Sequence, residues 1–300
     1  MSERFQFNRL EVAGSLGDLG TLLPMLIGMI LINGMDPIGL LVVIGLYYVA
    51  SGLYFGVTVP VQPMKVIGAY AIATGLPAQQ IFASGIWMAG LLFLIGVTGL
   101  IDVIGRAVPK AVIRGVQLST GTLLMAEGTR FIIGRSKFQL MIGAAEPYLD
   151  LRKIGNIPIG ILLGILAGGI VMWFMNNRRF PAGLLVVVGG AVVGLLLGTH
   201  EGLSELKLGI NLPRWLPFGW PAQADWMTAL FVLALPQLPM TVGNAVVADA
   251  DLSKEYFGQR SHRVTYRSLT ISMAIANLAS AVLGGMPLCH GAGGLAAHYR

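Results

Sequence analysis

The sequence is poor in the residues on which a soluble or secreted protein relies. Only 11% of its 300 residues are charged, and it contains a single cysteine. One cysteine cannot form a disulfide within the chain, which excludes a disulfide-stapled secreted scaffold. A water-soluble domain normally carries about 25% charged residues, so this composition argues against one. No small-residue cleavage site precedes the first apolar run, and residues 1–11 are therefore expected to be an uncleaved tail.

Two chemical signatures are missing as well. No His/Cys cluster has metal-ligand spacing, and no Gly-Lys-Ser/Thr loop for nucleotide phosphates is present. We therefore expect no metal, no other cofactor, no ATP-driven pumping and no enzyme activity. The pair Asp249 and Asp251 suggests an intramembrane aspartyl protease, but the basic residues that follow it favour a solvated, charge-balanced cytoplasmic loop. The net charge of +6 lies between apolar runs and is interpreted as an orientation signal, with no nucleic-acid partner.

What the sequence has in quantity is apolar side chains. Hydrophobic residues make up 55% of the chain, and the mean hydropathy is +0.75. A membrane helix needs roughly 20 mainly apolar residues, and by that measure about ten segments qualify. They are expected at 12–33, 38–57, 61–75 (short), 79–101, 110–132, 157–175, 181–199, 226–248, 266–283 and from 288 onward. The chain is thus predicted to be an all-α polytopic protein of the lipid bilayer.

The distribution of basic residues predicts the orientation of these segments. If the N-terminus lies inside, the short outside loops at 33–37, 75–79 and 284–287 carry no Lys or Arg. The opposite orientation would place the basic clusters outside. We therefore expect a multi-pass protein with a cytoplasmic N-terminus, in the plasma or inner membrane.

Two polar, proline-containing stretches interrupt apolar segments, one at 58–65 and one at 285–294. Unpaired backbone groups in hydrocarbon cost several kcal/mol each, so such breaks need a reason. Paired breaks in two halves of a chain are typical of a binding site between the internal repeats of a secondary transporter. A half-helix that begins inside the membrane points N–H groups and the positive end of its dipole at a ligand, which suits an anion. The alternative is a packing seam of small residues.

An internal repeat is weakly visible. Leu23-Pro-Met-x-x-Gly28 recurs as Leu238-Pro-Met-x-x-Gly243, and Pro60-Val-Gln-Pro corresponds to Pro287-Leu-Cys-His. If the eighth segment starts the second copy, the unit has an odd number of spans, and the copies are inverted with respect to each other. The sequence stops within the tenth segment, so about four further spans are expected to complete the repeat.

Four motifs in order resemble the molybdate transporter family, a branch of the sulfate permease superfamily. They are Gly14-Ser-Leu-Gly-Asp-Leu-Gly-Thr21, Pro60-Val-Gln-Pro-Met-Lys65, Leu235-Pro-Gln-Leu-Pro-Met-Thr-Val-Gly-Asn-Ala-Val-Val247 and Met286-Pro-Leu-Cys-His-Gly-Ala-Gly-Gly-Leu-Ala-Ala297. The resemblance implies a seven-plus-seven inverted-repeat fold with a core and a gate domain. It also implies uptake of a tetrahedral oxyanion, most simply molybdate, by alternating access. Residues 1–105 and 225–300 would then belong to the core and 106–224 to the gate. A homodimer is left open.

The candidate binding residues come first from the two breaks. Gln62 and Lys65 share one helix face if the third segment starts there, offering an amide donor and a cation. Lys65 alternatively snorkels or pairs with Asp18. Gly291 and Gly293 would let an oxyanion approach the backbone, since no Cβ intrudes.

Two neighbours of these glycines and one residue of the first segment complete the set at the breaks. Cys289 is expected to be a small apolar filler at the same place. His290 either serves proton coupling or is a hydrogen-bonded packing residue. Asp18, in the first segment, is expected to have a structural or proton-coupling role.

The eighth segment adds Gln237, Thr241 and Asn244 at i, i+4 and i+7, a polar stripe on an apolar helix. Of these, Gln237 and Thr241 are the preferred ligands, with interhelical hydrogen bonding as the alternative. Three candidate functions of the chain remain. They are import of molybdate, import of sulfate, and an anion channel or a non-transporting scaffold on the same fold.

Overall fold

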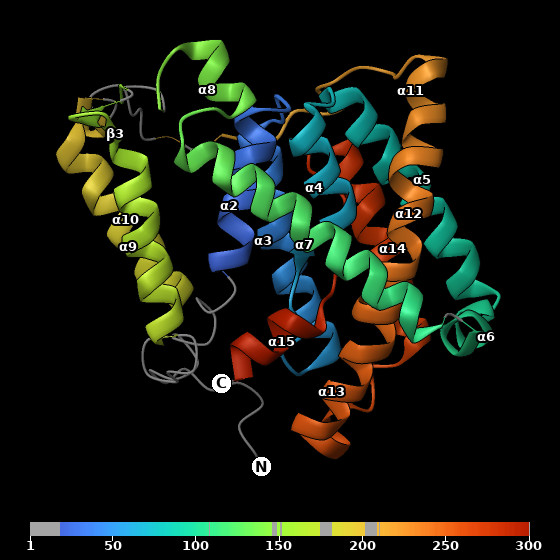
Figure 1. The fold of residues 1–300 in the computed structure, drawn as a ribbon. Helices are drawn as coiled ribbons and strands as arrows, with labels where there is room; N and C mark the ends of the chain where they lie inside the picture. Colours follow the sequence, from blue (N-terminus) through green and yellow to red (C-terminus); the bar gives the residue numbers. More distant parts are fainter. Residues whose placement is uncertain are drawn as a thin grey trace.

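The computed structural model confirms a mostly helical chain (Figure 1). It describes residues 19–107, 109–145, 149–150, 152–174, 182–201, 209 and 211–299. The helices outside the eighth segment are α2 (Leu19–Leu31), α3 (Pro37–Phe55), α4 (Lys65–Thr74), α5 (Ala78–Val97), α6 (Leu100–Ala107), α7 (Lys110–Ile132), α8 (Lys137–Ile142), α9 (Ile159–Phe174), α10 (Ala182–Leu197), α14 (Tyr266–Val282) and α15 (Ala292–Tyr299). They follow the predicted segments closely, except that α8 lies between two of them and that α6, separated from α5 by a turn at Gly99, continues beyond the segment at 79–101 to residue 107.

Within the described residues, three helices are long and apolar enough to cross a membrane. These are α3, α5 and a continuous helical run from Gln223 to Ser261. Shorter apolar helices accompany them, among them α4 and α9. The predicted first segment begins at residue 12, and the part of it before residue 19 lies outside the described residues.

Local sequence explains where the helices near the two breaks begin and end. Pro37 occupies the first position of α3, and the Asp36 carboxylate caps that helix by accepting a hydrogen bond from the Ile38 N–H (3.1 Å). Gly75 stops α4 with a φ of 67°, a conformation that favours glycine. Asn33 then donates its amide to the carbonyls of Ala71 and Leu76, both at 2.8 Å. Asn33 therefore ties the end of α2 to the end of α4.

The Gln223–Ser261 run is the eighth predicted segment, and it is not uniform. It passes through α11 (Gln223–Thr228), the π-helix η2 (Ala229–Ala234), α12 (Leu235–Met240), the π-helix η3 (Thr241–Ala248), α13 (Asp249–Phe257) and the 3-10 turn η4 (Gly258–Ser261). Pro236 and Pro239 lie in α12, where they remove backbone donors from the helical ladder. Wide π turns lie on both sides of this proline-containing helix.

One sequence prediction is wrong in this run. Asp249 and Asp251 were expected in a solvated loop, but both lie in α13, which continues the helix past residue 248. Asp251 is exposed, whereas Asp249 is 0% exposed. The composition of the segment indicated a loop because it is charged, yet the helix turns Asp249 toward its neighbours and Asp251 away.

The described helices pack around three clusters of buried side chains, of which the smallest includes Phe55 and Leu269. One cluster joins α2 and α3 and includes Met29 and Leu40. Another joins α4, α5 and the Gln223–Ser261 run, with Ile67, Met88 and Leu233 at 0% exposure. α5 lies along α14 and η2, and α7 crosses α4 and α12, while α9 and α10 pair at one edge of the molecule (Figure 1).

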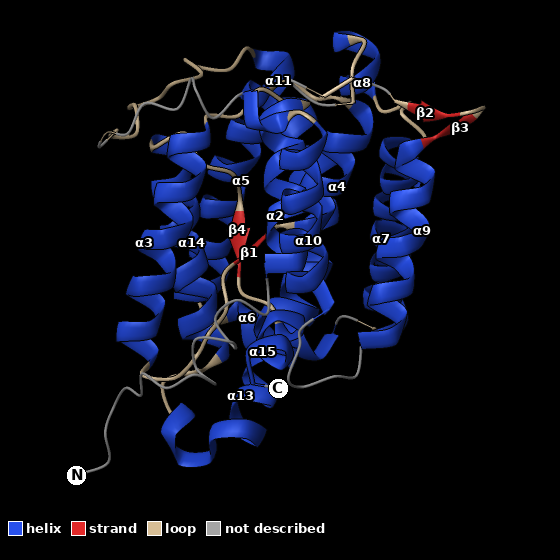
Figure 2. Cartoon of the chain, turned by 90° about the vertical axis from the view of Figure 1, so that its left-hand side faces the viewer, coloured by secondary structure: helices blue, strands red, loops and turns tan. Residues whose placement is uncertain are grey.

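The two predicted breaks meet in the interior. β1 (Gln62–Pro63) pairs antiparallel with β4 (Leu288–Cys289), with Gln62 opposite Cys289. The Met64 N–H extends this ladder by donating to the Pro287 carbonyl at 2.9 Å. Figure 2 shows the ladder near mid-height, surrounded by helices. Backbone groups that would be unpaired in each break alone are thus paired with the other. A second, exposed hairpin joins β2 (Lys153–Ile154) to β3 (Ile157–Pro158).

Candidate anion site at the strand crossing

The pairing of β1 with β4, called the crossing below, is stabilised by a residue that the sequence prediction missed. Asn277, in the middle of α14, is fully buried. Its Nδ2 donates to the Leu288 carbonyl (2.8 Å), and its Oδ1 accepts from the Leu288 N–H (3.0 Å). A side-chain amide therefore serves β4 as a neighbouring strand would. The signal in the sequence was an asparagine within an apolar span, where a polar group needs a partner.

From this crossing, α4 starts at Lys65, and its first N–H groups are met by another helix. Gln237 Oε1 accepts hydrogen bonds from the Val66 N–H (2.9 Å) and the Ile67 N–H (3.3 Å). Met64, the residue before the helix, offers no side-chain cap. Gln237 thus caps α4 from α12, satisfying two donors that a helix start leaves unpaired.

The polar stripe of the eighth segment is continuous in space. Gln237 Nε2 donates to Thr241 Oγ1 at 3.0 Å, and both side chains are fully buried. This bond lies within the Gln223–Ser261 run, whereas the contacts of Gln237 Oε1 with α4 are interhelical, as one of the two interpretations of the stripe expects. A primary amide carries two N–H bonds, so Gln237 keeps one more donor than these contacts use. Contact with a ligand stays a prediction for both residues.

Gln62 and Lys65 lie together, as the helical spacing predicted. Lys65 Nζ donates to Gln62 Oε1 at 2.8 Å. Gln62 is 2% exposed, while Lys65 is only partly buried. Among the described residues no carboxylate forms a salt bridge with Lys65. Asp18, its predicted alternative partner, lies outside the described residues, so that pairing and any proton-coupling role of Asp18 stay untested.

The two glycines at the start of α15 differ sharply in their surroundings. A Cβ added at Gly291 would collide with Gln62 Oε1 and would also lie 3.5 Å from Asn244 Nδ2. A Cβ added at Gly293 would meet no described atom within 4 Å, and this residue is exposed. Gly291 is therefore needed for the packing of the crossing itself. Gly293 lies next to open space at the first turn of α15.

His290 is engaged on a different side of the crossing. Its Nδ1 lies 3.0 Å from the Pro60 carbonyl, and because a carbonyl only accepts, Nδ1 carries the proton. Its Nε2 lies 2.8 Å from Tyr47 Oη and 2.7 Å from Ser272 Oγ. The ring is fully buried between α3 and α14. These contacts fit the packing interpretation of His290, in which its polar atoms are satisfied by the protein.

Cys289 occupies the position expected of an apolar filler. Its side chain is 5% exposed and belongs to the core cluster formed with Ile67 and Met273. Its Sγ lies 3.8 Å from the Pro63 carbonyl, across the strand ladder. Direct contact with a ligand stays untested for Cys289, as it does for His290.

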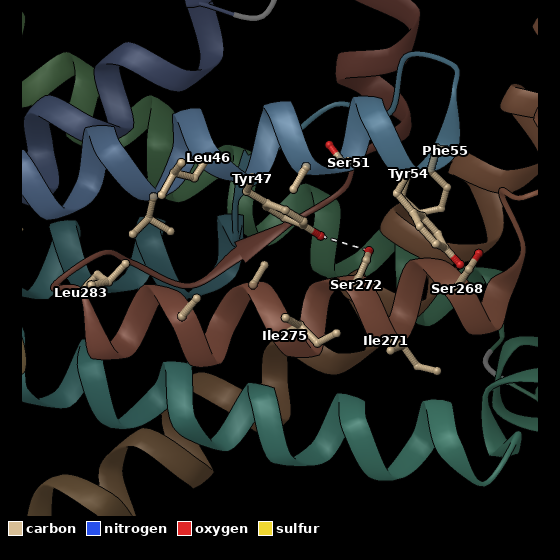
Figure 3. Close-up of a pocket in the computed structure, with 14 residues that line it drawn as sticks. Leu46, Tyr47, Ser51, Tyr54, Phe55, Ser268, Ile271, Ser272, Ile275 and Leu283 are labelled. Atoms are coloured by element: carbon tan, nitrogen blue, oxygen red, sulfur yellow. Dashed lines mark hydrogen bonds between the residues drawn. The ribbon is translucent and has the colours of Figure 1, made fainter.

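An open groove lies elsewhere, between α3 and α14 (Figure 3). It has a volume of about 400 Å³, and none of its lining residues is charged. A hydrogen bond between the Tyr47 and Ser272 hydroxyls (3.2 Å) spans it, and the exposed side chains of Leu46 and Ile275 lie along it. A dianion would lose its hydration there without gaining a cation, so the crossing is the better candidate.

Comparison with known proteins gives a consistent result. A family profile described as "Molybdate transporter of MFS superfamily" matches residues 10–124 and 229–300. Molybdate transporter 1 of Chlamydomonas reinhardtii is 32% identical over 383 residues, covering 97% of this chain and 73% of that protein. Molybdate transporter 2 of Arabidopsis thaliana is 31% identical, covering 97% and 67%.

A solved structure supports the fold. The transmembrane domain of a cyanobacterium bicarbonate transporter, BicA, superposes with a TM-score of 0.63 at 16% identity. The match covers 98% of this chain and 78% of that one. At this identity the likeness concerns the fold alone.

Proposed function

This chain belongs to the molybdate transporter family, and from that premise we propose that it carries molybdate across a membrane. It is an integral membrane protein, and it is not an enzyme. The finer parts of the proposal are secondary active import by alternating access and a cytoplasmic N-terminus. In the same proposal the core, residues 1–105 and 225–300, moves against a gate at 106–224, and the fold is a seven-plus-seven inverted repeat of the sulfate permease type.

The observation that carries the proposal is the meeting of two helix starts at a hydrogen-bonded crossing. α4 and α15 begin directly after β1 and β4, so the positive ends of both helices lie near the ladder. Lys65 adds a full charge beside them. Molybdate is a tetrahedral dianion with four acceptor oxygens, and N–H groups at a helix start are suited to such a ligand.

The two helix starts do not contribute equally. Gln237 already accepts hydrogen bonds from two of the first N–H groups of α4. The open space beside Gly293 favours α15 as the main source of backbone donors. In this arrangement Lys65 attracts the dianion through its electric field. The second N–H of Gln237 completes the set of hydrogen-bond donors around the dianion.

A role for protons rests on weaker support. The hydrogen bonds of His290 to Pro60, Tyr47 and Ser272 favour a structural role for this residue. Proton coupling therefore stays a prediction, to be decided by imposed pH gradients and not by the identity of His290.

The decisive experiment is uptake of labelled molybdate into proteoliposomes that contain the chain. We expect saturable uptake that tungstate inhibits and that an imposed ion gradient drives. Stronger inhibition by sulfate than by unlabelled molybdate would instead assign sulfate as the main substrate. Large unitary currents without saturation would identify a channel. Absence of binding and of flux, with the protein folded, would refute the proposal.

A further inference from the structure

A second polar site lies beyond Gln237 in the Gln223–Ser261 helical run. Asp249, the first residue of α13, is 0% exposed, and neither of its carboxylate oxygens has a hydrogen-bond partner among the described residues. Ser253 is also 0% exposed, and its hydroxyl is likewise without a partner. The two residues are four apart in one helix and therefore share a face.

Such a pair needs an explanation, because buried polar groups in proteins are almost always hydrogen-bonded. A buried carboxylate without a partner is especially costly. Among the buried side chains that the structure describes, Asp249 is the only acid, and none is a lysine or an arginine. No described buried side chain therefore supplies the compensating positive charge.

The geometry distinguishes the possible sources of this charge. A proton alone would neutralise the carboxylate but would leave the Ser253 hydroxyl without a partner among the described residues. A divalent ion would leave one uncompensated positive charge in an apolar interior. A monovalent metal ion balances the single carboxylate and takes oxygen ligands from both side chains.

We propose that Asp249 and Ser253 bind a monovalent metal cation, of which Na⁺ is the test case. The site follows η3 directly, and π-helical turns are common at functional sites because they displace side chains from the regular ladder. α13 packs against α15 (Figure 1), so a bound cation would lie beside the helix whose start forms part of the candidate anion site. Cation binding itself does not depend on the proposed transport of molybdate.

The test measures thermal unfolding of the full chain in detergent, without molybdate. NaCl, KCl and choline chloride are compared at constant ionic strength. We expect Na⁺ to raise the melting temperature in a saturable way, as a ligand of the native state does, and choline to have no such effect. In Asp249→Asn the Na⁺-specific rise should disappear. In Ser253→Ala the apparent dissociation constant should increase at least about tenfold.

Asp251→Asn is the matched control, since Asp251 lies two residues away in the same helix and is exposed. This variant should keep the full response to Na⁺. If Asp249→Asn does not fold, line broadening of the ²³Na resonance by the wild-type chain, reduced in Ser253→Ala, decides the question. Equal responses to all three salts, a response that follows pH alone, or an unchanged response in Asp249→Asn would each overturn the inference.

Discussion

Replacing Gly291 with alanine tests the packing of the crossing most directly. The added methyl group would overlap Gln62 Oε1 and approach the Gln62 Cδ to 3.1 Å. Gln62 is buried, and its Oε1 accepts the hydrogen bond from Lys65 Nζ. The side-chain amide can move aside only by giving up that bond. We therefore expect the cost to combine steric strain with the loss of one charge-assisted hydrogen bond.

The size of the effect follows from these two contributions. Inserting a methyl group into a packed interior typically costs about 1–3 kcal/mol. A hydrogen bond to a charged group contributes about 1.5–3 kcal/mol when buried, but Lys65 is partly exposed, and water can replace much of what it loses. The free energy of unfolding of Gly291→Ala should accordingly fall by about 1–3 kcal/mol. Binding of molybdate should weaken as well, because Lys65 loses the group that holds it.

Gly293→Ala is the matched control, two residues further along. No described atom lies within 4 Å of a methyl group there, and alanine is favoured over glycine in a helix by about 0.5–1 kcal/mol. The two variants should therefore change stability in opposite directions. The assay is unfolding by SDS in mixed micelles, followed by calorimetry with molybdate. Wild-type stability and affinity in Gly291→Ala would refute the packing described for the crossing.

Three further substitutions test the remaining contacts. Gln237→Leu, close in volume, leaves two N–H groups at the start of α4 without their acceptor, and SDS unfolding should register a loss of about 1–3 kcal/mol; undiminished stability would mean that the cap contributes nothing. Lys65→Ala should weaken molybdate binding at low ionic strength and flatten its dependence on salt, as measured by calorimetry; an unchanged affinity at every salt concentration would exclude an electrostatic role. Asn277→Leu removes both hydrogen bonds to Leu288 and should cost about 2 kcal/mol or more in the same unfolding assay; a cost near zero would show that β4 is held by β1 alone.

Hydropathy predicted the positions of the helices well, because each apolar segment carries its own length and period. The helix expected at 110–132 is α7, and the one expected at 266–283 is α14 within one residue. Prolines and glycines predicted the two breaks for the same reason, since they act locally on the backbone. The helix starts expected near Gln62–Lys65 and Cys289–Gly293 lie at Lys65 and Ala292.

What the sequence could not predict is the choice of partners. Gln237 is expected either to face a ligand or to hydrogen-bond between helices, and the sequence does not say that its interhelical partner is the start of α4, 171 residues earlier in the chain. Asp249 was placed in a loop because its neighbours are charged, and only the rotation of α13 buries it. These relations depend on how distant segments meet, and no local pattern encodes that meeting.

The strand crossing also has a consequence for how the protein is made. Its two strands are far apart in the chain, with Cys289 and Pro63 separated by 226 positions. At a synthesis rate of about 5–20 residues per second, the ribosome needs on the order of 10–45 s to make the second strand after the first. During that interval β1 has no partner and α4, only 10 residues long, has no cap from Gln237. The third apolar segment must therefore wait in the translocon or at the bilayer surface in a provisional form until the second break has been made.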